Sequence, residues 1–427
     1  MLKKNIKSIV MMKWANSLFP INRSITGAGL RQTINYIKKI NKNFKKKKIK
    51  SNTKVFDWKI PNEWKITSAY IKHIDGEKIC DFKDNNLHIL GYSTKINKIL
   101  TFKQLKKNIF YSKKNPKAIP YYTSYYKKNW GFCLSYNKFK KIKKNSKYKV
   151  VINSSHFRGQ LDYTELVIKG KSSKEILLVS YICHPSMANN ELSGPLIIMA
   201  LSKILRPMKY TIRLVLIPET IGAIAYIKLN FSRLKKNLIA GFNLTCVGDN
   251  GPFTLISSKE GNTYSDKIAK RILDKTPKFK VLSFLSRGSN ERQFGCQNLN
   301  LPFVTICRKR FGDYKEYHTS ADNLEILNYT TIKETVNFIK KIVFEINRNE
   351  IYKKNYFCEP FLSKANLINN FGTLENIKKN NRKSISNFLA YVDKSHDLTS
   401  LKKKIKVENI KKLAKALEKN KFISKEL

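Results

Sequence analysis

The residues best suited to chemistry lie in one segment, Tyr181–Gly194, which reads Tyr-Ile-Cys-His-Pro-Ser-Met-Ala-Asn-Asn-Glu-Leu-Ser-Gly. It follows an apolar, strand-like run at 175–180 and opens an apolar, helix-like run at 195–202. An imidazole, His184, and a carboxylate, Glu191, therefore stand where a strand leaves its sheet. In open α/β sheets, ligands and metals are held at such strand ends. We take this turn as the first candidate for a functional site.

Later segments place more metal-competent side chains in equivalent positions. Glu219 follows a strand-like run at 211–217, Asp249 follows another at 240–246, and His318 lies in a later loop. Each alone has a plainer interpretation as a helix cap or a surface residue. Together they favour a hydrolytic metal centre, in which His and Asp bind the metal and a separate Glu acts as base.

The elements that must position these residues alternate along the chain. The sequence predicts strands at 175–180, 211–217, 240–246 and 302–307, and helices at 195–205, 221–229, 264–274 and 330–347. Such alternation is typical of an α/β domain whose mixed sheet has helices on both faces. We assign residues 166–350 to this domain.

The rest of the chain divides into three further parts. Residues 9–40 read as helical and a basic linker at 42–52 follows them; we expect residues 1–50 to be the N-terminal part of the α/β domain. Short β-like pieces, many aromatics and several prolines predict a β-rich insert over 51–165. The tail, 355–427, contains three short helical patterns followed by a wing-like Phe-Ile pair, which is the layout of a winged helix.

Composition limits the class of protein. A chain of 427 residues that is 42% hydrophobic can bury a large core and form two or three domains. It has no apolar run long enough to span a membrane, and its first apolar stretch is too short for a secretory signal. Its 7 cysteines are scattered, without the spacing of a zinc knuckle or a redox motif. We therefore expect a cytoplasmic protein with reduced thiols.

The formal net charge of +54 would ordinarily point to a nucleic acid partner. The excess is mostly Lys in runs with Asn and Ile, which favours solvated surfaces over a dedicated polyanion site. The candidate recognition helix of the tail, 407–417, has few side chains suited to base edges. Nucleic acid binding is kept as a less favoured alternative.

The order of these segments resembles the zinc-aminopeptidase fold of peptidase clan MH. More closely, it resembles a bacterial family of aminopeptidase-like proteins with a β-rich insert and a C-terminal winged helix. Proteins of that kind are described as domains of unknown function or as polysaccharide biosynthesis proteins with an aminopeptidase-like domain. The segments that carry the resemblance are Phe19–Gly27, Tyr181–Gly194, Pro218–Gly222, Arg287–Phe294 and Tyr317–Ser320.

The resemblance implies a role for each matching residue. His184, Asp249 and His318 fall on zinc ligands of the peptidases. Glu219 falls on the glutamate that deprotonates the zinc-bound water. A metal-dependent amide hydrolase is therefore the function that the resemblance implies.

The chain departs from the peptidase pattern at three positions. Asn189 stands where the peptidases have a bridging Asp, Thr220 where they have a further Glu ligand, and Ser186 where they have an Asp behind the first His. A two-metal centre would be short of negative charge, so we expect one Zn²⁺. Glu191 is the residue in the same turn that could replace a lost carboxylate.

Four residues are candidates for binding a small peptide or amide substrate. Arg23 and Arg287 could hold a substrate carboxylate, because Arg recognises such groups with two hydrogen bonds. Asn189 and Glu291 complete this set. Two alternatives stay open: a regulatory protein with a degenerate peptidase core and a working winged helix, and a binding protein without metal. We also expect a homo-oligomer.

Overall fold

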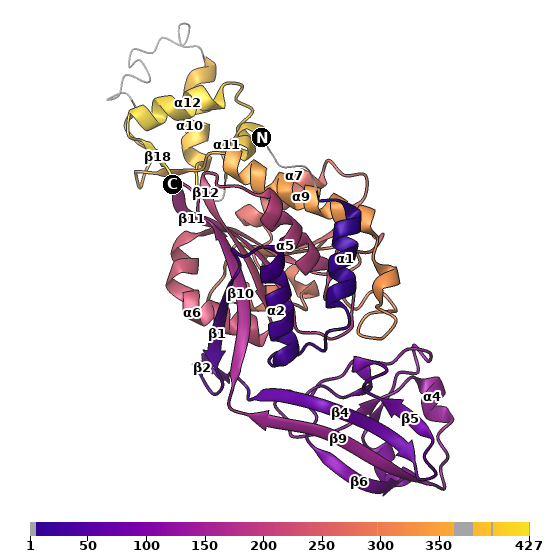
Figure 1. The fold of residues 1–427 in the computed structure, drawn as a ribbon. Coiled ribbons are helices and arrows are strands. Elements are labelled where there is room, and N and C mark those ends of the chain that lie inside the picture. Colours follow the sequence, from indigo (N-terminus) through magenta and orange to yellow (C-terminus); the bar gives the residue numbers. More distant parts are fainter. Residues whose placement is uncertain (1–5, 297, 363–378, 394–395, 427) are drawn as a thin grey trace.

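The chain forms three parts that follow one another along one axis (Figure 1). The computed structural model describes residues 6–296, 298–362, 379–393 and 396–426. An α/β domain lies in the middle, with the β-rich insert at one end and the C-terminal tail at the other. This arrangement separates the described residues of the insert from those of the tail.

An eight-stranded sheet forms the centre of the molecule. In spatial order its strands are β1 (Lys45–Lys50), β10 (Gln160–Ile168), β12 (Tyr210–Ile217), β11 (Ser172–Tyr181), β13 (Leu238–Leu244), β16 (Phe303–Cys307), β14 (Phe253–Ile256) and β15 (Phe279–Leu282). Strands β12, β11, β13 and β16 run parallel. Their carboxyl ends therefore meet at one edge, where the predicted site residues follow them.

Both faces of the sheet are covered, as the apolar runs predict. Ile176 and Leu178 of β11 belong to the core on one face, and Leu177 and Val179 to the core on the other. Because neighbouring side chains of a strand point to opposite faces, both must be apolar when both faces are buried.

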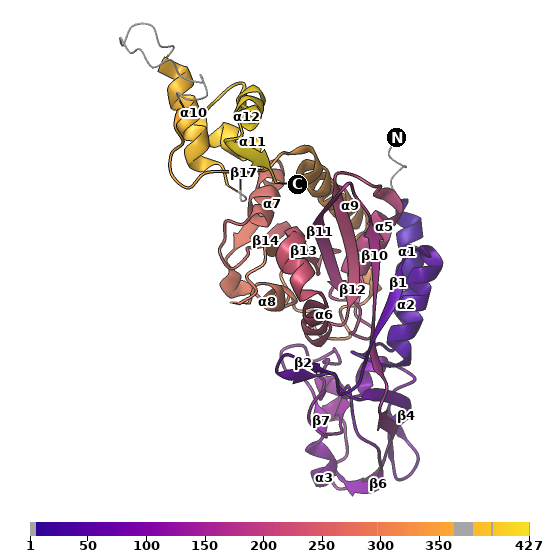
Figure 2. The same cartoon turned by 90° about the vertical axis from the view of Figure 1, so that its left-hand side faces the viewer.

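Among the described residues, five helices pack on the first face and two on the second. Figures 1 and 2 show the sheet and its helices from two sides. The first group comprises α1 (Ser8–Leu18), α2 (Ala28–Ile40), α5 (Ser193–Ile204), α7 (Tyr264–Leu273) and α9 (Tyr329–Arg348). The second group comprises α6 (Ile221–Asn237) and the short α8 (Glu291–Phe294). Among the residues that the structure describes, no helix has both the length and the apolar character needed to cross a bilayer.

The insert contains a four-stranded antiparallel sheet with the order β5-β4-β9-β6. These strands are β4 (Glu63–His73), β5 (Lys78–Asp81), β6 (Ile96–Thr101) and β9 (Lys147–Phe157). The smaller elements are β2 (Lys54–Val55), β3 (Trp58–Lys59), η1 (Asn86–His88), α3 (Phe102–Lys106), β7 (Ile109–Phe110), β8 (Phe132–Cys133) and α4 (Tyr136–Lys140). A β-rich insert was expected, and the structure has one.

The boundaries of the insert differ from those that the sequence predicts. The range 42–52 is not only a linker, because Lys45–Lys50 is the edge strand β1 of the main sheet. The range 51–165 ends too late, because β10 pairs with β1 and β12 and so belongs to the main sheet. Exposed lysines on an edge strand prevent pairing with other chains, which explains why a strand looks like a linker in sequence.

The tail has a small core of its own. It consists of β17 (Tyr352–Lys354), α10 (Lys379–Tyr391), α11 (Leu398–Ile405), α12 (Ile410–Lys419) and β18 (Ile423–Lys425), with β17 and β18 antiparallel. The three predicted helices are present. The winged-helix assignment stays a prediction, and part of its range, 363–378, 394–395 and 427, lies outside the described residues.

An ion pair between a buried carboxylate and a partly exposed arginine joins the tail to the α/β domain. Arg271 of α7 donates from both terminal nitrogens to Asp397, over 2.8 and 2.9 Å, and Tyr264 donates to the same carboxylate. Asp397 also accepts from the backbone N–H of Ser400 and thereby caps α11. One buried carboxylate thus both begins a tail helix and attaches the tail.

We predict that Asp397→Asn weakens the attachment of the tail by about 1–2 kcal/mol, because Arg271 loses charged hydrogen bonds to Asp397 but keeps its ion pair with Glu345. Asn is itself a good N-cap, so the cap of α11 is retained. Amide hydrogen exchange in α11 and β18 should become faster, whereas the central sheet should be little changed. Asp313→Asn removes an exposed ion pair with Arg310 and serves as the control. Equal exchange in the two variants would contradict the prediction.

Candidate functional site

Three of the predicted site residues lie together at the carboxyl edge of the sheet. His184 follows β11, Glu219 follows β12, and His318 lies in the loop after β16. The Nε2 atom of His184 is 3.7 Å from Oε2 of Glu219, and the rings of His184 and His318 have centres 5.3 Å apart. Segments that are distant in sequence therefore meet in one group.

His184 is held from its other ring nitrogen. Its Nδ1 lies 2.6 Å from Oε2 of Glu191 and 3.5 Å from Sγ of Cys183. Burial by itself would lower the pKa of His184, but the interactions with Cys183 and Glu191 outweigh burial and raise the pKa well above its ordinary value. The ring is thus fixed at Nδ1, and Nε2 faces Glu219.

The surroundings of Glu219 raise its pKa, whereas those of His318 lower its pKa. Burial raises the pKa of Glu219, although the neighbouring His184 and a hydrogen bond from Ser289 act against this rise. Burial lowers the pKa of His318 to about 3, and the charge of His184 adds to this effect. His318 is therefore a neutral imidazole at neutral pH, which is the form that binds metals.

Arg23 lies beneath the turn and has no exposed side-chain surface. Its Nε donates to the carbonyl of His184 over 2.9 Å, and its Nη1 donates to the carbonyl of Leu18. Nε is also 3.9 Å from Oε1 of Glu191. We predicted contact with a substrate carboxylate, but in this structure the guanidinium is bound to the protein's own backbone.

Asp249 and Asn189 are bound to each other. Asn189 donates from Nδ2 to Oδ2 of Asp249 over 2.9 Å, and its Oδ1 accepts from the N–H of Gly248. The other oxygen of Asp249 accepts from the N–H of Gly251 over 2.7 Å. Among the contacts of the described residues, none joins Asp249 to His184 or His318. Asp249 is therefore held by Asn189 and by its own loop in this structure.

Arg287 and Glu291 do not contact the group directly. Glu291 is buried and accepts from the N–H groups of Gly288 and Ser289 and from the hydroxyl of Thr305, so it holds the turn before α8. Arg287 is exposed and lies over the ring of Phe284. The same turn reaches the site through Ser289, whose Oγ donates to Oε1 of Glu219 over 2.7 Å. Sequence reasoning missed Ser289.

Asp322 is the second residue that sequence reasoning missed. Its carboxylate accepts from the backbone N–H groups of Ala188, Asn189 and Asn190, over 3.3, 2.6 and 2.9 Å, and from the hydroxyl of Tyr314. It thus fixes the turn that carries Glu191. The sequence feature that could have identified Asp322 is its position four residues after His318, in a loop already chosen as part of the candidate site.

Backbone strain is concentrated in the loops of the site. Ser186, Thr220, Cys246 and His318 all have positive φ, between 46° and 58°. These residues have side chains that disfavour the left-handed region, so each conformation has a cost that the surrounding structure must offset. Such residues tend to occur at functional sites.

A cavity of about 220 Å³ adjoins His184 and Glu219. Its walls also include Ile25, Trp58, Tyr125 and Tyr126, of which the last three come from the insert. The insert is attached here through Tyr121, whose N–H donates to the carbonyl of His318 and whose ring contacts both His184 and His318. Side chains of the insert thus cover the site.

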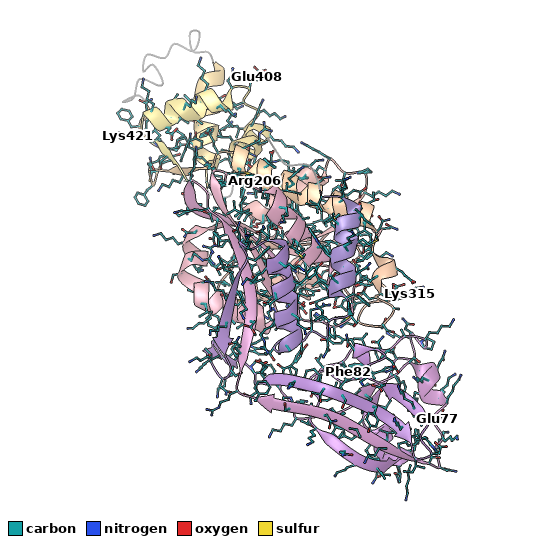
Figure 3. All side chains as sticks on the ribbon, in the orientation of Figure 1. Glu77, Phe82, Arg206, Lys315, Glu408 and Lys421 are labelled. Atoms are coloured by element: carbon teal, nitrogen blue, oxygen red, sulfur yellow. The ribbon has the colours of Figure 1, made fainter. Side chains whose placement is uncertain are left out.

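Loop contacts strengthen this junction. The N–H of Ser320 donates to the carbonyl of Ile119, and the side chain of Asn115 donates to the carbonyl of Lys315 over 3.2 Å. Figure 3 labels Lys315 on the loop of the central domain that approaches the insert. The His318 loop is therefore held by the insert on one side and by the turn after β11 on the other.

The donors of the group fit a metal ion. Nε2 of His318 is buried and has no hydrogen-bond partner among the described residues. The ring of His318 lies beside that of His184. A buried polar atom without a partner is costly, and a metal would satisfy it. The combination of two imidazoles and nearby carboxylates is a donor set that Zn²⁺ accepts.

A second arrangement of donors lies on the opposite side of His184. One ligand atom each from Cys183, His184 and Glu191 lie within 4.8 Å of one another. This arrangement is less suited to a cation, because Nδ1 is already bound to Glu191 and the positive charge of Arg23 is close. Burial also raises the pKa of the Cys183 thiol, which makes it a poor ligand and a poor nucleophile.

Comparison with known proteins places the chain in a family. Residues 12–349 match a family model described as a domain of unknown function, DUF4910. The chain belongs to this family. A relative from Clostridium acetobutylicum is 41% identical over 359 residues, which cover 83% of this chain and 82% of the relative. It is presented as a candidate polysaccharide biosynthesis protein with an aminopeptidase-like domain.

Solved structures confirm the fold of this DUF4910 protein. A crystal structure of a candidate peptidase from Clostridium acetobutylicum is 37% identical, with a TM-score of 0.79 over 98% of this chain and 96% of that one. BSAP, a zinc aminopeptidase from Bacillus subtilis, is 13% identical, with a TM-score of 0.58 over 80% and 95%. The latter likeness shows the fold alone. The resemblance to aminopeptidase-like proteins is therefore confirmed.

We predict that Asp322→Asn destabilises the protein, because one carboxylate oxygen becomes an amide that cannot accept from the turn. The loss should be about 1–3 kcal/mol at pH 5, as for buried N–H groups left without a partner. Urea unfolding measures it, and faster exchange of the 188–190 amides would locate it. Glu325→Gln, an exposed change in the same loop, is the control.

We also predict that the stability of the wild type depends on pH and that the contribution of Asp322 to this dependence is absent in Asp322→Asn. Burial raises the pKa of Asp322 to about 6, above the ~3.9 of an unfolded chain. The folded wild type thus binds this proton more tightly than the unfolded chain, so its stability falls as pH rises through 6. The amide of the variant does not titrate, and the stability difference should shrink between pH 5 and pH 7.5. A difference that grows over this range would contradict the assignment.

Proposed function

We propose that this protein is a metal-dependent amide hydrolase resembling an aminopeptidase, with one Zn²⁺. The observation that carries the proposal is the buried, unpartnered Nε2 of His318, whose ring lies beside that of His184, which in turn faces Glu219. The aminopeptidase-like fold and the description of the relative from Clostridium acetobutylicum support it.

Two imidazoles would hold the metal from Nε2, those of His184 and His318. A catalytic zinc site needs a third protein ligand and an open position. We propose Asp249, whose Oδ2 now accepts from the amide of Asn189, as this third ligand. Bound there, Zn²⁺ would supply a Lewis acid and activate water at neutral pH.

Glu219 would act as the general base. Its Oε1 is fixed by the hydroxyl of Ser289, and its Oε2 lies toward His184. One oxygen is thus held in place while the other is directed at the position where water would be deprotonated. The cavity beside it is small and largely aromatic, which favours a small peptide or amide substrate.

The conditions around the thiols fit a reducing compartment. All seven cysteines are free, and five of them are buried. Free thiols persist where glutathione and thioredoxin keep them reduced. We therefore keep a cytoplasmic location as part of the proposal.

We predict that the protein binds one Zn²⁺ per chain after reconstitution and that His184→Ala and His318→Ala each abolish this binding. Elemental analysis of the dialysed proteins is the measurement. His156→Ala, a change of an exposed histidine in the insert, should bind zinc normally. Less than stoichiometric zinc in the wild type would overturn the metal site.

We further predict that Glu219→Gln retains zinc but lowers the hydrolysis of an aminoacyl-p-nitroanilide panel by about 10²–10⁴-fold, as for loss of a general base. Zinc content and kcat/KM are measured on the same preparation. A variant that keeps both zinc and activity would exclude Glu219 as the base.

A further inference from the structure

The two ring nitrogens of His184 have different surroundings, and this difference defines what each one does. Nε2 faces Glu219 and the cavity, where the proposed metal would bind. Nδ1 lies 2.6 Å from Oε2 of Glu191, which has no exposed surface. A histidine that binds a metal through one nitrogen needs the other nitrogen to be held.

Glu191 has one oxygen engaged and one without a hydrogen bond. Oε2 contacts Nδ1 of His184, whereas Oε1 is buried, has no hydrogen bond and lies 3.9 Å from Nε of Arg23. Nη2 of Arg23 is likewise buried and without a partner. Burying a carboxylate and a guanidinium is costly even when they are paired. A pair that is incompletely hydrogen bonded adds little stability, which favours a functional reason for its presence.

We infer that Glu191 and Arg23 are positioning residues that orient His184, and that Glu191 is not a metal ligand. Glu191 holds Nδ1, so Nε2 is the nitrogen that faces Glu219 and the cavity and would bind the metal once it has lost its proton. Arg23 balances the charge of Glu191 and holds the backbone carbonyl of His184. The inference deepens the proposed function and, for its role toward the metal, rests on it.

The surrounding structure keeps Glu191 in this position. The backbone N–H groups of the three preceding residues, 188–190, are bound to Asp322. Helix α5 begins two residues later, at Ser193, and a carboxylate is favourable near a helix N-terminus. To bind a metal instead, Glu191 would have to release Nδ1 and bring a cation toward Arg23.

Ser186 stands where the peptidases have an Asp behind the first metal-binding His. The sequence lacks an acidic residue two positions after His184, and the hydroxyl of Ser186 instead accepts from Asn86 over 2.8 Å. The orienting carboxylate comes from seven residues after His184. We had expected Glu191 as a replacement ligand, and the geometry points to a replacement orienter.

The first test uses metal-free protein with ¹⁵N-labelled histidine. The short contact to Glu191 should give a far-downfield proton on Nδ1 of His184, assigned by its loss in His184→Ala. In Glu191→Gln this proton should move upfield or vanish, because a neutral acceptor is weaker than a carboxylate. In Glu219→Gln, the matched control on the opposite nitrogen, it should remain. A proton unchanged in Glu191→Gln would overturn the inference.

The second test measures metal binding by calorimetry and the visible spectrum of the Co²⁺ form. A positioning role predicts that Glu191→Gln binds Zn²⁺ about 10- to 100-fold more weakly and keeps the wild-type Co²⁺ spectrum. A changed spectrum would show that Glu191 is a ligand and would overturn the inference.

Failure of the proposed function can be distinguished from failure of the inference. If the wild type binds no metal, the hydrolase proposal fails, and the Nδ1 proton in metal-free protein still decides whether Glu191 orients His184. If Glu191→Gln does not fold, Glu191→Asp shortens the same side chain and is read by the same resonance. If the chemical shift of the Nδ1 proton is the same in Glu191→Asp as in the wild type, the inference is overturned.

Discussion

The contact on which the site depends is the carboxylate of Asp322 against three successive backbone N–H groups. It ties the loop that carries His318 to the turn that carries Glu191, although the two segments are 134 residues apart at Ala188 and Asp322. Without the carboxylate, the N–H groups of Asn189 and Asn190 would lose their acceptor, which costs more than a typical hydrogen bond contributes, whereas that of Ala188 also donates to the backbone carbonyl of Asp322 over 2.8 Å. One loop-to-turn contact therefore links the segments that carry the two histidines.

Charge balance is the second constraint. The region behind His184 contains a guanidinium, a carboxylate and an imidazole with almost no access to water. Apolar residues of similar volume would be at least as stable in such a position. The positive φ values of Ser186 and His318 add strain at the same place. Stability has been given up where orientation of a side chain is needed, as expected for a site that must be pre-organised.

The sequence predicted the elements whose pattern is set by burial alone. The four parallel strands are apolar on both faces, so β11, β12, β13 and β16 lie close to their predicted ranges. Strand β1 was missed because an edge strand of lysines has the composition of a linker. The contacts of Arg23 and Asp249 could not be read at all, since their partners lie far away in sequence. Residue type identified the candidate side chains, whereas their partners, such as Glu191 for Nδ1 of His184, are visible only in the tertiary structure.

The position of the insert explains why a domain outside the sheet can take part in the site. The chain leaves the main sheet after β1 and returns in β10, and these neighbours pair antiparallel with Lys50 opposite Gln160. Because β10 is antiparallel to β12, with Thr164 opposite Leu216, the beginning of β10 lies beside the carboxyl end of β12. The insertion point is therefore at the edge from which Glu219 projects. From this edge, the long segment of the insert between β7 and β8 brings Tyr121 onto His184 and His318, so the insertion point lets aromatic side chains of the insert cover the candidate site.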